Sequence, residues 1–271
     1  MYAWWTALAL AKDPTEVTFR FGWAAGDVAT AAIESLDTAK RDGHTYETMV
    51  KEALQLAVRA DGAGLAVRET IVAVAETQRV DGVPQAAKAS VAFLEALSKV
   101  DTDAKIAADG TFAGLVDDAL YRQQLTAASD AFFAGVLAKI TDPDKRARAD
   151  AAFESLRKSV SADASIAETA ADWRWETAFW SGRTLKVGES LKAEGDERVV
   201  TFGLTGTSPC SDERHAPVCA DVTLNVQEGG VDSRRVGRVE VATLRPWSWT
   251  QDDTLPDGGT RHHSETWVWT P

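Results

Sequence analysis

The chain has 271 residues, and 45% of them are hydrophobic, so it can bury a normal core as one large domain or two small ones. Its formal net charge is −12. Such an acidic chain offers no basic stripe that could bind phosphates, so we expect no nucleic-acid partner. The same charge disfavours docking on anionic lipid. No stretch after the N-terminus approaches roughly 18 uninterrupted apolar residues, so we also expect no transmembrane segment.

The first eleven residues are mostly apolar and end in Ala9-Leu10-Ala11, followed by Lys12, Asp13 and Pro14. This pattern is typical of the end of a secretory signal with a small-x-small cleavage site, although a basic leading region is missing. We therefore expect residues 1–11 to be the remnant of a signal peptide. A short helix or strand that packs on the domain is the alternative.

The first third of the chain shows the two-residue period of β-strands. Apolar residues alternate with polar or small ones from Val17 to Trp23, which predicts a half-buried strand. Residues 28–40 leave two interpretations open, because their alanines favour helix and their place between strands favours strand. Alternation over 50–59 and 65–73, around the glycine-rich turn 61–64, predicts a hairpin.

The middle of the chain changes to helical spacing. Residues 84–97 predict a helix, and residues 105–116 predict a small hairpin that turns at Asp109 and Gly110. Helical periodicity and proline placement then predict helices over 120–140, 143–159 and 163–180. From Arg183 onward we expect strands over 183–187, 199–206, 219–227, 237–249 and 261–269.

The order of strands, helices and strands favours the α+β class over an alternating α/β fold. We expect a single domain over 12–271. Its curved antiparallel β-sheet would form a half-barrel, and a helical insertion at about 84–180 would pack on the concave face.

The chain has only two cysteines, Cys210 and Cys219, in a stretch rich in prolines and turn-forming residues. A disulfide that closes a hairpin loop fits this spacing and requires an oxidising compartment. A metal site with His215 as third ligand, or two reduced cysteines, are the alternatives. The metal site lacks a fourth ligand and a short Cys-x-x-Cys knuckle.

Tryptophan is the most informative residue type. Trp247 and Trp249, like Trp267 and Trp269, are two apart, which places each pair on one face of a strand. Such a cluster forms either the core of a sheet or the wall of an apolar pocket, and indole N–H groups need partners in both. Stacking on sugar rings is a further alternative. The candidate ligand-lining residues are Trp23, Trp173, Trp180, Trp247, Trp249, Trp267 and Trp269.

The sequence offers little support for catalysis. No Gly-x-Ser-x-Gly motif is present, and His44, His215, His262 and His263 all look like surface residues. The adjacent pair His262 and His263 points to opposite faces of a strand and so makes a poor metal chelate. We expect no catalytic residues, no metal and no cofactor, and therefore no enzyme.

Several local sequences carry a resemblance to a known group of proteins. They are Thr18-Phe-Arg-Phe-Gly-Trp23, Ala25-Gly-Asp27, Ala53-Leu-Gln-Leu-Ala-Val58, Leu65-Ala-Val-Arg-Glu69, Ala107-Ala-Asp-Gly-Thr-Phe-Ala-Gly114, Phe179-Trp-Ser-Gly182 and Leu185-Lys-Val-Gly-Glu189. Together they resemble uncharacterised bacterial secreted proteins and lipoproteins and, more distantly, the half-barrel of periplasmic lipoprotein carriers of the LolA/LolB type. The lipobox cysteine of lipoproteins is not part of the match. The resemblance implies an open barrel whose concave face holds an apolar molecule.

These observations lead to one functional expectation and one alternative. We expect an exported, non-enzymatic carrier or binding protein for a lipid-like ligand, in the periplasm or outside a bacterial cell. The alternative is a structural protein with a fully packed core that binds partners of the bacterial envelope or an extracellular assembly. The expected partner is accordingly a lipid-like small molecule or an envelope protein.

Overall fold

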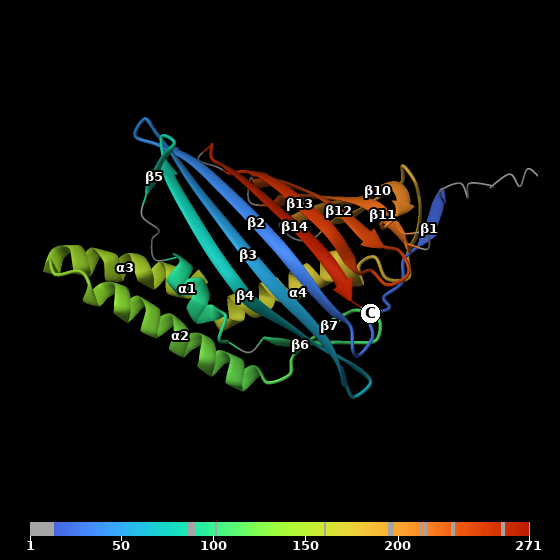
Figure 1. Ribbon diagram of the computed structural model, residues 1–271, viewed down its shortest axis with the longest axis horizontal. Helices are drawn as coiled ribbons and strands as arrows, with labels where there is room; N and C mark the ends of the chain where they lie inside the picture. Colours follow the sequence, from blue (N-terminus) through green and yellow to red (C-terminus); the bar gives the residue numbers. More distant parts are fainter. Residues whose placement is uncertain are drawn as a thin grey trace, which may run out of the picture.

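A computed structural model describes residues 14–85, 90–100, 102–159, 161–194, 198–211, 213, 216–228, 231–255 and 258–270. The predicted signal remnant therefore lies outside the described residues, and so does His215. The main feature is a curved antiparallel sheet that does not close (Figure 1). Its twelve strands run in the order β7-β6-β4-β3-β2-β14-β13-β12-β11-β10-β9, with β5 paired to β4. This confirms the predicted α+β half-barrel.

The first half of the sheet consists of β2 (Val28–Arg41), β3 (His44–Asp61), β4 (Gly64–Val80), β5 (Val83–Gln85), β6 (Asp103–Ile106) and β7 (Phe112–Leu115). The second half consists of β9 (Ser190–Glu194), β10 (Arg198–Pro209), β11 (Val218–Glu228), β12 (Val231–Glu240), β13 (Pro246–Thr254) and β14 (Thr260–Thr270). The halves join where β14 pairs with β2. A separate two-stranded sheet pairs β1 (Glu16–Thr18) with β8 (Thr184–Lys186).

Asp-Gly turns set the long hairpins of the first half. Asp42 and Gly43 connect β2 to β3, Asp81 and Gly82 connect β4 to β5, and all four residues have positive φ. This conformation suits the tight turns that match the twist of paired strands. The predicted hairpin at 61–64 is present, and the open choice at 28–40 is settled as strand, because both edges of β2 pair with neighbours.

One predicted strand is wrong. Residues 237–249 do not form a single strand, because the chain leaves β12 after Glu240 and enters β13 at Pro246. Leu244 turns the connection with a φ of 59°. The apolar alternation continues through this turn, since Leu244 is itself buried at 1% exposure, and the pattern therefore hid the corner. The short strand β9 was also not predicted.

Four α-helices lie between the two halves of the sheet in sequence. They are α1 (Ser90–Leu97), α2 (Asp118–Ala138), α3 (Pro143–Ser159) and α4 (Ala162–Trp173), and a π-helical turn, η1 (Arg174–Ala178), extends α4. The predicted helices and the small hairpin β6–β7 are present, but the helix predicted from residue 84 is wrong at its start, because Pro84 and Gln85 pair with β4 as part of β5. Helices α1, α2 and α3 group beside β4, whereas α4 runs beneath the sheet (Figure 1).

The π-helical turn changes which side chains meet the sheet. The amide of Phe179 donates to the carbonyl of Arg174, five residues back, so the turn holds one residue more than an α-helical turn. Trp175 and Phe179 then both contact Phe202 of β10, with ring centroids 5.6 and 3.6 Å away. The chain thus buries its aromatic run and still directs Glu176 toward the centre of the concave face.

Two buried clusters hold the helix and sheet together. One contains Phe19, Trp180, Phe202 and Trp249 and lies against β10–β13. The other lies against β2–β4 and β14 and includes Trp267, with Trp23, Trp173 and Trp269 packed on its margin. The two clusters share Phe21, which packs against both.

The predicted disulfide is present between Cys210 and Cys219, which lie at the ends of β10 and β11. Such a bond persists in oxidising compartments, which supports export from the cytosol. A Cys210→Ala/Cys219→Ala double variant should lose about 2–3 kcal/mol of unfolding free energy, because a bond that closes a short loop restricts the unfolded chain. Urea denaturation of the variant and of the oxidised parent would measure the loss; equal midpoints would contradict it.

Candidate functional site

A cavity of about 320 Å³ lies between the concave face of the sheet and helix α4. Its walls come from β2–β4, β6, β7, α2, α4, η1 and β12–β14. A second space of about 700 Å³ lies on the other side of α4, against β11–β14. Asp172, Arg235 and Glu265 line both spaces. A volume of 320 Å³ is about twice that of an engineered apolar cavity that holds benzene, so an organic molecule fits.

The structure brings four of the seven candidate tryptophans to this cavity. Trp23 comes from the segment after β1, Trp173 from the end of α4, Trp249 from β13 and Trp267 from β14. Leu54, Leu56 and Val67 of the inner sheet face complete an apolar wall. At one end the indoles touch, since the ring centroids of Trp23 and Trp173 are 5.1 Å apart.

The other three candidates do not line the cavity. Trp180 is 1% exposed and packs on Phe19 and Phe202, and its indole N–H donates to the carbonyl of Trp175 at 3.0 Å. Trp269 packs on Trp23 at 5.0 Å and donates to the Pro246 carbonyl at 2.7 Å. Trp247 is half-buried at the start of β13. Trp249 and Trp267 belong both to the buried clusters and to the cavity wall, whereas Trp180 and Trp269 serve packing alone.

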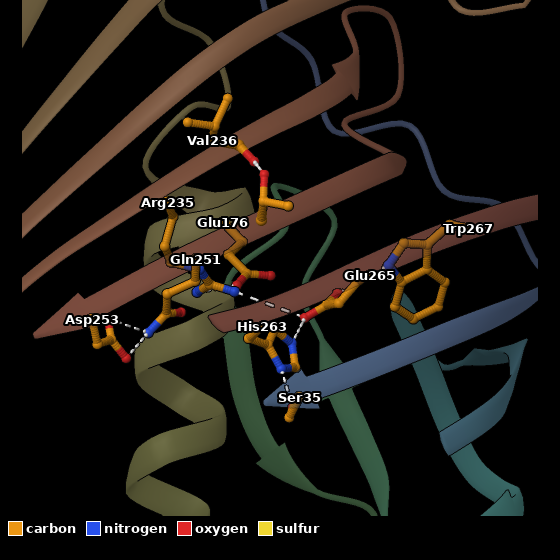
Figure 2. Close-up of polar contacts among 10 residues, drawn as sticks. Ser35, Glu176, Arg235, Val236, Gln251, Asp253, His263, Glu265 and Trp267 are labelled. Atoms are coloured by element: carbon orange, nitrogen blue, oxygen red, sulfur yellow. Dashed lines mark hydrogen bonds and ion pairs between the residues drawn. The ribbon is translucent and has the colours of Figure 1, made fainter. Parts of the chain in front are cut away.

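A polar network crosses the centre of the concave face (Figure 2). Arg235 of β12 lies with Nη1 2.5 Å from Glu176 Oε1 of η1 and with Nη2 3.9 Å from Glu265 Oε1 of β14. All three side chains are at most a quarter exposed. This network joins the helical insertion to the second half of the sheet.

The network extends along β14 to β2. His263 Nε2 is 2.8 Å from Glu265 Oε1, and Ser35 Oγ is 2.7 Å from His263 Nδ1. Trp267 donates its indole N–H to Glu265 Oε2 at 3.1 Å. His263 was expected on the surface, and this expectation is wrong: odd-numbered residues of β14 face inward, whereas His262 faces outward and contacts Asp252.

The carboxyl groups of the site are strongly perturbed. Burial, with the nearby carboxylates Glu265 and Asp172, raises the pKa of Glu69 to about 7. The side chain of Glu69 has a large accessible area because it faces the cavity. It nevertheless lies inside the half-barrel, since it comes from β4 at the position paired with the buried Leu56. Burial also raises the pKa of Glu176 to about 8 in spite of Arg235, since one guanidinium faces several carboxyl groups.

Glu265 behaves differently from Glu176. Burial opposes its ionisation, but the hydrogen bonds from His263 and Trp267 hold its pKa below the ordinary value. The two carboxyls that contact Arg235 are therefore shifted in opposite directions, with the pKa of Glu176 raised and that of Glu265 lowered. Carboxyl groups with separated pKa values are common at functional sites, although ion-pair networks produce them as well.

These shifts predict the pH dependence of stability. A carboxyl with a raised pKa in the folded state keeps its proton where the unfolded chain has lost it, so stability falls as pH rises from about 4.5 toward 8. Urea titrations across this pH range should show the fall, and Glu176→Gln should make it shallower. Glu168→Gln, on the exposed side of α4, is the control. An unchanged slope in Glu176→Gln would refute the assignment.

The chain Ser35–His263–Glu265 contains the residue types of a hydrolase triad. Ser35 lies in the middle of β2 and pairs with His263 on one side and Val50 on the other. The backbone of β2 at Ser35 forms the hydrogen-bond ladders to β14 and β3. It is not the strand-to-helix turn that presents a nucleophile next to oxyanion donors. We interpret the chain as a buried network that fixes β14 against β2.

Sequence reasoning missed the polar half of this site. Glu69, Glu176 and Arg235 are three among many charged residues in a chain with 41 acidic and 29 basic side chains, so composition gave no reason to select them. A usable signal was present for Glu69 and Glu265. Glu69 is a charged residue at an inward position of β4 between the apolar residues Val67 and Ile71, and Glu265 follows Trp267 on the inward face of β14.

The fold and site define an open α+β half-barrel with an internal cavity that is partly aromatic and partly acidic. No family model matches the sequence, and no curated protein matches it. Solved structures similar to it include the following two. A structure of lipovitellin and its lipid–protein interactions aligns with 92% of this chain at 7% identity and a TM-score of 0.45; the chain spans 26% of that protein's length.

The second similar structure is a protein from Bacteroides fragilis described as exported, with a YmcC-like fold. The alignment covers 91% of this chain and 96% of that chain, at 9% identity and a TM-score of 0.26. In the part of the chain that is described, no helix is long and apolar enough to span a membrane.

Proposed function

We propose that this protein is an exported, non-enzymatic carrier that binds an apolar, lipid-like molecule in the cavity of its half-barrel. The observation that carries the proposal is the cavity itself, which four tryptophans and several aliphatic side chains line between sheet and α4. Ligand sites are concave, mostly apolar and furnished with a few polar groups, and this cavity has that composition. The sequence resemblance to LolA/LolB-type carriers supports the same function and remains a prediction.

Tryptophan fluorescence tests the proposal directly, because Trp249 and Trp267 lie in the cavity wall. We expect methyl decanoate and monodecanoylglycerol, which carry no phosphate, to change the emission in a saturable way, and native mass spectrometry after mild extraction to show a bound lipid. Thr169→Phe would fill the cavity from α4 and should abolish the change. Thr250→Phe, the same substitution on the exposed face of β13, should leave binding intact.

The opposite outcome has a defined meaning. If neither probe binds, and the protein carries no lipid after mild extraction, the carrier function fails. The alternative from the sequence, a structural protein of the envelope or of an extracellular assembly, would then be favoured, and pull-down experiments would be the next step.

The non-enzymatic part of the proposal has its own test. We expect no hydrolysis of p-nitrophenyl decanoate above background, because Ser35 lacks an oxyanion site. Turnover by the parent protein that disappears in Ser35→Ala, while the melting temperature stays the same, would overturn this part and make the Ser35–His263–Glu265 chain a catalytic site.

A further inference from the structure

The cavity that we propose to hold a lipid-like molecule has an unusual charge distribution. The described residues in its wall include four carboxyl groups, Glu69, Asp172, Glu176 and Glu265, and one guanidinium, that of Arg235. The guanidinium is already engaged by Glu176 and Glu265. A carboxylate or phosphate headgroup would therefore be transferred from water to a space without a free cation among these residues, which is costly.

Glu69 is the carboxyl group of this set that is open to a ligand. It faces the cavity from β4, across from α4, and no described cation contacts its carboxyl oxygens. The contact that involves Glu69 goes to its backbone carbonyl, which accepts from Thr102. A positively charged group beside Glu69 would pair with its carboxylate and relieve the repulsion that Glu69 experiences from Asp172 and Glu265.

The aromatic wall favours the same kind of group. Trp23, Trp173 and Trp267 line the cavity that Glu69 faces, whereas the ring of Trp249 is already engaged by the Arg235 guanidinium, 5.3 Å from its centroid. Indole is the best of the aromatic rings for binding cations, and several such rings together are the usual device for recognising ammonium groups.

Two indole N–H groups of the cavity wall lack an acceptor in the part of the chain that the structure describes. Trp249 is 2% exposed, and its indole N–H is unpaired among the described residues, as is the buried N–H of Trp23. Trp247, which does not line the cavity, has a buried N–H without a described partner as well. Unpaired buried donors are costly, so an oxygen of a bound molecule would stabilise either cavity indole if its ring turned the N–H toward the cavity.

From this geometry we infer that the cavity selects a cationic amphiphile, namely an apolar molecule that carries an ammonium group beside Glu69 and an oxygen acceptor near the indole N–H groups. The inference rests on the proposed carrier function and specifies its ligand class.

Three probes with the same acyl chain separate the contributions of the ammonium group, the ester and a negative charge to binding. Decanoylcholine carries an ammonium and an ester, methyl decanoate carries the ester alone, and decanoate is an anion. Binding is measured by tryptophan fluorescence and by calorimetry below the micellar range, in about 0.3 M salt, so that attraction to the acidic surface is screened. We expect decanoylcholine to bind about tenfold more tightly than methyl decanoate, and decanoate most weakly.

Glu69→Gln should reduce the ratio between decanoylcholine and methyl decanoate toward one and leave methyl decanoate binding unchanged. The control is Glu34→Gln, on the opposite face of the sheet, which changes the net charge equally and should keep the ratio. Because the probe series on the parent protein needs no variant, poor folding of Glu69→Gln would not prevent a decision.

Two results would overturn the inference and are distinguishable. If methyl decanoate or decanoate binds as tightly as decanoylcholine, the carrier function stands and the charge selectivity is refuted. If none of the three binds, the carrier function and the ligand class fail together. An undiminished ratio in Glu69→Gln would show that the selectivity arises elsewhere than at Glu69.

Discussion

Replacing Arg235 by methionine is expected to lower the free energy of unfolding by about 3 kcal/mol near neutral pH. The guanidinium is 14% exposed and lies between Glu176 and Glu265, which are also largely buried. Removing one partner of a buried ion pair leaves uncompensated charge, and such changes cost about 3–5 kcal/mol. We choose the lower end because Glu176, whose pKa is raised to about 8, can hold a proton.

The pH dependence of this variant distinguishes lost charge from lost packing. Without Arg235, the pKa values of both carboxyls rise, that of Glu176 from above its ordinary value and that of Glu265 from below it, so the penalty should shrink as pH falls toward about 5. Urea denaturation at two pH values measures it. Arg234→Met, one residue away and on the exposed face of β12, should change stability by less than about 0.5 kcal/mol. Equal losses in the two variants would refute a special role for Arg235.

A second large effect is expected at Gly237 of β12, which lies directly opposite Trp249 of β13. A Cβ atom built on Gly237 would lie 2.3 Å from the Cζ3 atom of the Trp249 ring, so the ring must move. We therefore expect Gly237→Ala to cost about 3 kcal/mol, the upper end of the range for overpacked cores. The displaced indole should also weaken ligand binding, since Trp249 lines the cavity.

The matched control is Gly135→Ala in helix α2. Nothing lies within 4 Å of a Cβ atom there, and alanine favours helix, so stability should rise by about 0.5–1 kcal/mol. Thermal melts and the emission maximum of tryptophan would report both variants. If Gly237→Ala keeps the stability and the emission maximum of the parent, the position of the Trp249 ring does not require a glycine at residue 237.

The sequence predicted the fold well where local patterns decide structure. Alternation identified the hairpin around residues 61–64, and prolines and periodicity identified the helices up to Trp180. The prediction failed at Leu244, where a buried apolar residue occupies a corner and continues the strand pattern without a break. The glycine of this region, Gly237, lies within β12 against the ring of Trp249. It therefore did not indicate the turn at Leu244.

The site was predictable mainly on its apolar side, with a local signal on the polar side for the inward charged residue Glu69. Tryptophan is rare enough that its spacing on strands is informative, and four of the selected indoles do meet at one cavity. The pairing of Arg235 with Glu176 depends on where a helix and a distant strand meet, and on the π-helical turn that rotates Glu176 toward the sheet. Neither is a local property, so no pattern in the sequence could indicate it.

The open sheet has one further consequence, which concerns self-association. A sheet that stays open keeps two edge strands, and unpaired edges attract other chains. One edge, β7, contacts helices α2 and α4. The other edge, β9, is five residues long and carries Lys192 and Glu194. The molecule therefore limits aggregation by cover at one end and by short length and charge at the other, and the cavity can stay open without a closed barrel.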